Sequence, residues 1–261
     1  MRNSAVFYLT RNDVRTPGGL DKYDDYGVLL AGGECEVSDV NLAKKLSPGK
    51  LVAAYLLVSD LPQTLKGYPG AFANYVGGAP FVVYGKGSPN PLHHVGLLSD
   101  ATVKWTVEQA QLCVGDADIL MLDCFSPKNC SWAPGVSFDG SGKATTQKVV
   151  TENWTKYVLL TVAALHEAMP DVMLVCNTGH GVNPSMVQEP LRSIYREFCS
   201  HVNGIGYEEG KPLTPAAWGG PFRRPGLSLF FTASELSFAR AMNEMIFPPN
   251  VVPAMRSWLV K

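Results

Sequence analysis

Short apolar runs alternate with stretches of helical periodicity along nearly the whole chain. Runs without polar alternation are typical of parallel strands that are buried on both faces. The intervening segments repeat apolar residues every three to four positions, as amphipathic helices do. The expected strands are Ala5–Thr10, Gly27–Ala31, Leu51–Ser59, Phe81–Tyr84, Ile119–Asp123, Val172–Asn177, Gly204–Glu209 and Leu227–Thr232.

Strands that alternate with helices predict an α/β fold with a parallel sheet. An open, doubly wound sheet shows the same alternation, but its usual Gly-x-Gly-x-x-Gly fingerprint after the first strand is absent here. The chain has 261 residues, and a closed (β/α)8 barrel typically needs about 250. No internal repeat or interdomain linker interrupts the pattern. We therefore expect residues 1–261 to form one TIM-like barrel domain.

Charge and hydropathy exclude two classes of partner. The formal net charge is -1, so no broad nucleic-acid footprint is expected. No apolar stretch approaches the roughly 20 residues of a membrane span, so no membrane is expected as a partner. The apolar part of the N-terminus is too short for a signal peptide. Either the protein is not secreted by that route, or the sequence is that of a trimmed mature domain.

The cysteines and histidines indicate neither a metal site nor a cofactor. The six cysteines include no Cys-x-x-Cys pair, so a zinc ribbon has no support. Cys124 and Cys130 are close enough in sequence for a loop disulfide, although free thiols are the favoured interpretation. The neighbours His93 and His94 cannot easily share one ion. Two glycosylation sequons, at Asn129 and Asn153, have meaning only in a secretory pathway.

Polar residues stand where several of the predicted strands end. In a barrel, such residues face the active-site mouth at the C-terminal ends of the strands. Asp123, Asn177 and the pair Glu208-Glu209 occupy three such ends, and Glu34 follows the second strand. Two carboxyl groups that converge on one mouth are what glycoside hydrolysis needs, one as acid and one as nucleophile or base. A polysaccharide or oligosaccharide is therefore the expected substrate.

Other side chains are candidates for holding a sugar. An amide such as Asn177 can hydrogen-bond a sugar hydroxyl or orient a carboxylate. His180 lies in the glycine-containing loop that follows Asn177. Aromatic residues near strand ends or in loops could stack on sugar rings; the candidates are Tyr8, Tyr84, Phe125, Trp132 and Trp218.

Four segments resemble the endo-α-1,4-polygalactosaminidases of glycoside hydrolase family 114 and their relatives in family 135. They are Leu46–Ser59, Ala117–Asp123, Val172–Asn177 and Gly204–Glu208, and together they span most of the chain in the expected order. The resemblance implies a barrel with Asp123 and Glu208 as the catalytic pair and Asn177 as a substrate-binding neighbour. It also implies a galactosamine-containing or related amino-sugar polymer as substrate, and export. The long loop Cys124–Lys148 departs from the family pattern.

Several alternatives stay open from the sequence. Neighbouring strand residues point to opposite sides, so only one of Glu208 and Glu209 should face the mouth, and Glu208 is favoured. A barrel that binds glycans without cleaving them would keep the aromatic residues and tolerate loss of either carboxylate. The loop Thr178–Pro184 opens a helix, whose N-terminus can hold an anion, so a phosphosugar- or carboxylate-binding lyase or isomerase is another alternative.

Overall fold

The computed structural model describes residues 2–24, 26–63, 65–84, 91–127, 130–177, 189–208, 223, 227–231, 244–246, 257 and 259. At 2–8, 84, 206–208, 227–231 and 244–246 it describes the backbone alone. Within these ranges, no helix is long and apolar enough to span a lipid bilayer.

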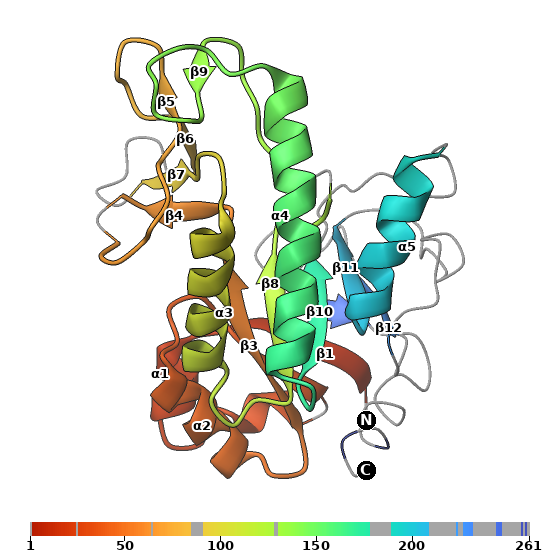
Figure 1. Cartoon of the computed structure of the whole chain (residues 1–261). Helices are drawn as coiled ribbons and strands as arrows, with labels where there is room; N and C mark the ends of the chain where they lie inside the picture. The colour runs from red at the N-terminus through yellow and green to blue at the C-terminus, as the bar shows by residue number, and fades with distance from the viewer. Residues whose placement is uncertain are drawn as a thin grey trace.

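A parallel sheet forms the centre of this mixed α/β fold (Figure 1). Its central strands are nearly all apolar, and every residue of the two middle ones, β8 and β10, is buried. Burial on both faces explains why these strands read as continuous apolar runs in the sequence. In hydrogen-bonded order the strands are β2 (Tyr26–Ala31), β3 (Leu51–Leu57), β8 (Ile119–Asp123), β10 (Met173–Asn177) and β11 (Gly204–Glu208).

Three further strands flank this sheet. β1 (Arg2–Leu9) pairs in parallel with β2, and β12 (Leu227–Phe231) pairs in parallel with β11. β13 (Glu244–Ile246) runs antiparallel to both β1 and β12, so it links the two edges of the sheet. This antiparallel strand corrects the expectation of a regular eightfold β/α repeat. The sequence analysis did not predict β13, which is only three residues long.

Helices pack against the outer face of the sheet. α3 (Asp100–Val114) and α4 (Gln147–Ala168) lie side by side over β3, β8 and β10 (Figure 1). The Thr106 hydroxyl and the Tyr157 phenol join them through a buried hydrogen bond of 2.6 Å. The main core combines buried side chains of α4, such as Trp154 and Val158, with strand residues such as Leu122. The other helical segments are α1 (Arg11–Arg15), η1 (Asp21–Tyr23), α2 (Val37–Leu46) and α5 (Leu191–His201).

Polar side chains brace the N-terminal ends of the strands. Asp118 precedes β8, accepts a hydrogen bond from the Val52 amide at 2.8 Å and forms an ion pair with Lys44 at 2.5 Å. Asn203 precedes β11 and accepts a hydrogen bond from the Leu174 amide at 2.8 Å. Each contact ties the start of one strand to its neighbour, which helps fix the register that aligns the opposite ends.

The expected barrel strand Phe81–Tyr84 belongs to a different sheet. Its residues form β6 (Val82–Tyr84), which pairs antiparallel with β7 (Leu92–His94), while β7 also pairs with β4 (Asp60–Pro62). The run is short and its next neighbour along the chain offers an antiparallel partner, so it pairs locally. With β5 (Asn74–Tyr75) and β9 (Val136–Ser137), these strands lie at the upper end of the molecule in Figure 1, beyond the C-terminal end of β3.

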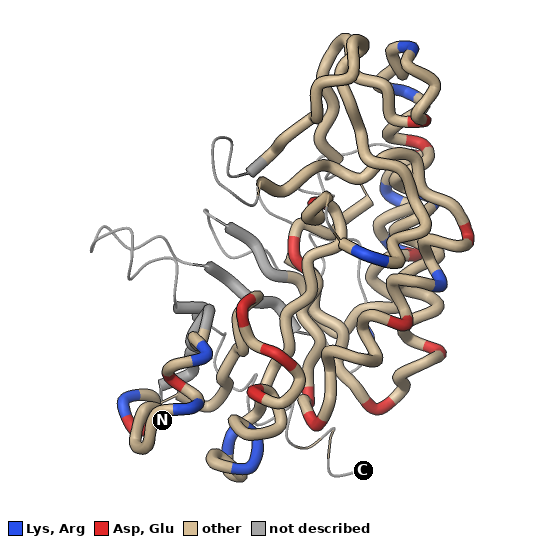
Figure 2. Tube along the Cα trace, turned by 90° about the vertical axis from the view of Figure 1, so that its left-hand side faces the viewer, with Lys and Arg blue, Asp and Glu red and all other residues tan. Residues whose placement is uncertain are grey.

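Charges and thiols are unremarkable in their distribution. Acidic and basic residues are interspersed along the described chain (Figure 2), in keeping with its nearly balanced charge. None of the six cysteines forms a disulfide, so Cys124 and Cys130 are not joined in a loop disulfide. Asn153 is engaged on α4: its amide donates to the Leu98 carbonyl at 2.9 Å and accepts from the Leu98 amide at 2.8 Å. Both polar atoms of this sequon residue are therefore already in use.

We expect Asn153→Ala to lower the free energy of unfolding by about 1–3 kcal/mol, because it leaves both backbone groups of Leu98 without their partner. Urea unfolding followed by circular dichroism measures this. Lys148→Ala, on an exposed face of the same helix, is the control and should change stability by less than about 0.5 kcal/mol. Equal effects of the two substitutions would show that the hydrogen bonds between Asn153 and the Leu98 backbone do not stabilise the fold.

Candidate active site

The site is built around the carboxylate of Asp123, the last residue of β8. Three donors hold it: the Tyr55 hydroxyl reaches Oδ2 at 2.5 Å, and the Asn177 amide reaches Oδ1 at 2.6 Å. The backbone amide of Cys124 also donates to Oδ1, at 2.9 Å. Asp123 is 9% exposed and Asn177 is fully buried. Hydrogen bonds to a charged acceptor are the strong ones, so this arrangement stabilises and orients an ionised carboxylate.

Strand register explains why these side chains meet. Asp123 pairs with Leu57 on β3, and Tyr55 stands two residues earlier on that strand, which puts it on the same face. On the other side, β10 pairs with β8 through Cys176 and Leu122, so Asn177 follows in step with Asp123. The sequence prediction that Asp123 and Asn177 converge is confirmed in this respect.

The opposite face of the same strands belongs to the core. Cys176 and Leu122 pack in the main hydrophobic cluster, and Cys176 is fully buried. Burial raises the pKa of the Cys176 thiol well above its usual value, so it stays protonated. Strand alternation therefore turns Cys176 into the core, away from Asp123 and Asn177, and a buried, protonated thiol is not a nucleophile.

The chain turns sharply just after Asp123. Cys124 has a positive φ of 51°, a left-handed conformation that is uncommon outside glycine. This turn lets the Cys124 amide face back to the Asp123 carboxylate. The next amide, of Phe125, donates to the Asn177 carbonyl at 2.8 Å and joins the ends of β8 and β10. Strained residues of this kind concentrate at functional sites.

A second buried carboxyl group, Asp60, stands three residues after Leu57, the partner of Asp123 on β3, and was missed by the sequence analysis. It begins β4, is 3% exposed and accepts a hydrogen bond from the Ser59 hydroxyl at 2.7 Å. Burial raises the pKa of Asp60, and the charge of Asp123 raises it further, against the opposing influence of His94 and Ser59. The rule that selected Asp123, a carboxylate just past a strongly apolar strand, also applies to Asp60 and could have found it.

His94 lies across from Asp60 in the β4–β7 pair. Its Nδ1 is 2.6 Å from the Val95 carbonyl, which can only accept, so Nδ1 carries the proton. Its Nε2 then accepts from the Ser131 amide at 3.3 Å. Burial lowers the pKa of His94, which also favours the neutral ring. Aromatic rings surround it, those of Phe81, Phe138 and Trp154.

His93 does not share this environment. It stands next to His94 on β7, and its ring meets the Phe72 ring edge-on at 6.1 Å between centroids. Across the described ranges, no group of three or more His, Cys, Asp or Glu side chains has the arrangement of a metal site.

The remaining predicted residues fall into two groups. Glu34 is exposed, and its Oε1 accepts from the Arg11 amide at 3.3 Å. Trp132 is half-buried, packs on the small core around Phe138 and donates to the Thr145 carbonyl at 3.0 Å. Phe125 is fully buried, so it cannot stack on a sugar ring, which corrects that expectation. The side chains of Tyr8, Tyr84, Glu208, Glu209, His180 and Trp218 lie outside the described residues.

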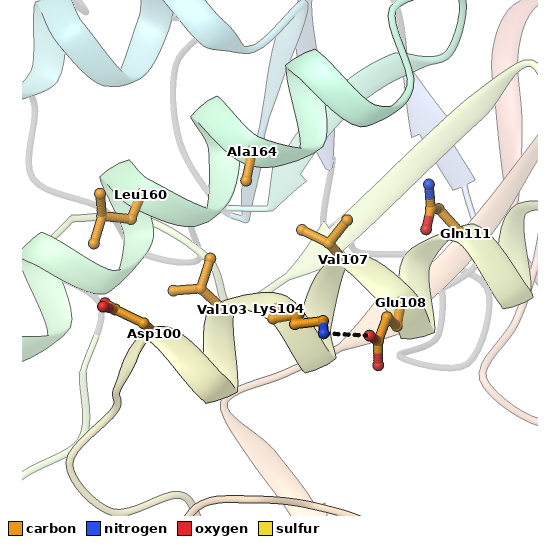
Figure 3. A pocket seen from close by; sticks show the side chains of 8 residues that line it. All are labelled: Asp100, Val103, Lys104, Val107, Glu108, Gln111, Leu160 and Ala164. Carbon is orange, nitrogen blue, oxygen red and sulfur yellow. Dashed lines mark ion pairs between the residues drawn. The ribbon is translucent and has the colours of Figure 1, made fainter.

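A groove of about 630 Å³ lies elsewhere, between α3 and α4 (Figure 3). Val103 and Val107 face Leu160 and Ala164 across it, and an ion pair of 3.9 Å joins Lys104 to Glu108 at its edge. None of the predicted site residues lines this groove. It is therefore separate from the Asp123 site.

No protein-family model matches the chain, and no curated protein matches it. Among solved structures, it is similar to the glycoside hydrolase domain of PelA from Pseudomonas aeruginosa, with 16% identity over 86% of this chain and 74% of that chain and a TM-score of 0.47. It is also similar to Ega3 from Aspergillus fumigatus in complex with galactosamine, with 8% identity over 79% and 65% of the two chains and a TM-score of 0.40. Each TM-score is below 0.5, so what these proteins bind or cleave remains a property of theirs.

We expect Asn177→Asp to destabilise the fold in a pH-dependent way. The substitution places a second carboxylate where an amide now lies 2.6 Å from Asp123. Like charges raise the folded-state pKa of the new group above its unfolded value, so stability falls as the pH rises through that raised value. Thermal unfolding should show a lower midpoint at pH 8 than at pH 5.

Asn177→Ala provides the control, because it removes the same hydrogen bond without adding a charge. It should cost about 1–3 kcal/mol at both pH values. A midpoint of Asn177→Asp that does not change with pH would show that residue 177 is not held against an ionised Asp123.

Proposed function

We propose that this protein is a glycoside hydrolase with a (β/α)8-type barrel, and that it cleaves a galactosamine-containing polysaccharide. The observation that carries the proposal is the Asp123 carboxylate at the C-terminal end of a central parallel strand, oriented by Tyr55, Asn177 and the Cys124 amide. Barrel enzymes place their catalytic groups at this end of the strands. The sequence resemblance to family 114 supports the choice of substrate.

Asp123 is suited to the carboxylate role in glycoside cleavage. Among the described residues, its Oδ1 has two donors whereas Oδ2 has one, the Tyr55 hydroxyl. A carboxylate oxygen can accept two hydrogen bonds, so Oδ2 keeps a lone pair for substrate or water. From this position Asp123 acts as nucleophile, as base toward water, or as a fixed negative charge beside the oxocarbenium-like transition state.

Glu208 is the proposed acid partner of Asp123. Gly206 on β11 pairs with Asn177 on β10, and Glu208 ends β11 two residues later. Residues i and i+2 of a strand share one face, which favours Glu208 over its neighbour Glu209. The family resemblance assigns the same pair of carboxylates.

We expect Asp123→Asn to abolish polysaccharide cleavage, with a loss of about 100- to 10,000-fold in kcat/KM. An amide has the shape of the carboxylate but supplies neither its charge nor its basicity. The measurement is mass spectrometry of the products released from a panel of polysaccharides that includes α-1,4-polygalactosamine.

Asp116→Asn is the matched control, because Asp116 is an exposed aspartate that precedes β8, at the end of the strand opposite Asp123. It should retain full activity. Glycan binding by the wild type without any product would instead favour a binding module. Neither binding nor product would favour a phosphosugar or carboxylate lyase or isomerase.

We expect Tyr55→Phe to lower kcat/KM on the same polymer about 10- to 100-fold, the equivalent of one hydrogen bond to a charged group. The phenyl ring keeps its packing against Gly33. The variant should therefore still fold, with a free energy of unfolding lower by about 1–3 kcal/mol because Asp123 loses one donor. Unchanged kinetics in a folded variant would exclude Tyr55 from orienting a catalytic Asp123.

A further inference from the structure

Asp60, which follows Ser59 just beyond the end of β3, is a buried carboxyl group that has no role in the mechanism proposed for Asp123 and Glu208. Asp60 stands three residues after Leu57, which is the residue of β3 that pairs with Asp123. The chain leaves the central sheet at this point and enters the small sheet above it. Asp60 therefore extends from the same strand end that supplies Tyr55, on the side where substrate would meet Asp123.

One oxygen of Asp60 is satisfied and the other is not. Oδ2 accepts from the Ser59 hydroxyl at 2.7 Å. Oδ1 is buried, and no described residue donates to it or accepts from it. Leaving a buried polar atom without a hydrogen bond costs about 1–3 kcal/mol, so the unpaired oxygen of Asp60 calls for an explanation. A ligand group that completes this hydrogen bond would recover the cost.

Among the residues that the structure describes, no lysine or arginine pairs with Asp60. His94 on β7 is its cross-strand neighbour, but the Val95 carbonyl and the Ser131 amide hold that ring in its neutral form. The other ionisable group that acts on Asp60 from a packed element is Asp123 on β8, which carries the same charge. Among the described residues, Asp60 takes part in no ion pair.

The two carboxyl groups have different environments. Asp123 receives hydrogen bonds from three groups, the Tyr55 hydroxyl, the Asn177 amide and the Cys124 amide. Asp60 receives one hydroxyl bond. Burial raises the pKa of Asp60, His94 and the Ser59 hydroxyl act against this, and the charge of Asp123 raises it further. Carboxyl groups with contrasting environments are typical of acid–base sites.

We propose that Asp60 is a substrate-contacting residue of this centre: in its protonated form, it donates a hydrogen bond from Oδ1 to an oxygen of the sugar held at Asp123. The Ser59 hydroxyl on Oδ2 leaves Oδ1 as the oxygen that carries the proton. A neutral acid of this kind binds a hydroxyl or ether oxygen and not an ammonium group, so Asp60 contributes to the choice of sugar. The inference rests on the proposed function.

The first test is independent of activity. In protein labelled with ¹³C at the aspartate carboxyls, the Asp60 resonance should titrate above the usual aspartate value of about 4. In Asp123→Asn the same resonance should titrate at lower pH, because the neighbouring charge is gone. Titration of Asp60 at or below the usual value in the wild type would overturn the inference, whether or not the protein cleaves a glycan.

The second test uses the pH dependence of kcat/KM on α-1,4-polygalactosamine. Asp60→Ala should lower kcat/KM about 10- to 100-fold, the equivalent of a lost hydrogen bond in a desolvated site. Asp60→Asn keeps an N–H donor but cannot ionise, so it should lose less activity and should retain it to higher pH than the wild type. Asp116→Asn should match the wild type throughout. If both Asp60 variants lose the same activity, and kcat/KM declines at the same high pH as in the wild type, Asp60 has only a structural role and the inference is overturned.

Failure of the proposed function can be separated from failure of this inference. If the wild type cleaves none of the polymers, α-1,4-galactosamine oligomers are added to the same labelled sample. A shift of the Asp60 carboxyl resonance would support the contact between Asp60 and a sugar, and an unchanged resonance would overturn it.

Discussion

The C-terminal end of the central sheet depends on one buried interaction, that of the Asp123 carboxylate with the three groups that donate to it. A carboxylate is costly to bury unless hydrogen bonds replace the water it loses. Here the replacements come from three places in the chain: Tyr55 on β3, Asn177 on β10 and the amide that follows Asp123 itself. Removal of any one leaves part of the desolvation cost uncompensated. The carboxylate thus constrains the relative positions of three adjacent strands at the end where chemistry is expected.

That constraint also explains the local backbone. Cys124 adopts its left-handed conformation where the chain must turn its amide back onto Asp123. The Phe125 amide then binds the Asn177 carbonyl, so the amide side chain of Asn177 and its backbone are fixed from the same turn. Backbone strain at one residue is offset by hydrogen bonds on both sides of it. A rigid carboxylate, with little reorganisation left to pay during reaction, is the functional consequence.

The sequence predicted the parts of this site that depend on strand order and failed where side chains reach across the fold. Asp123 and Asn177 were found because each ends a long apolar run, and parallel strands bring such ends together. Tyr55 was missed because it sits inside a strand, and only the register shows that its hydroxyl reaches the end of the next one. Asp60 was missed because Leu51–Ser59 was taken as one strand whose continuation was a loop. The sequence analysis also did not predict β13 or the pairing of β6 with β7. Both strands are short, and a short strand pairs with whichever strand lies near it.

The two ends of the sheet treat buried polar groups differently, and this contrast indicates where a ligand belongs. At the N-terminal ends, Asp118 meets Val52 and Lys44, and Asn203 meets Leu174, so their side chains have partners within the protein. Such polar groups serve the fold. At the C-terminal ends, Asp60 keeps an oxygen that no described residue contacts, beside a carboxylate with a lone pair to spare. A buried oxygen without a hydrogen bond costs free energy, and under the proposal above a sugar hydroxyl or ether oxygen supplies the missing bond at Asp60.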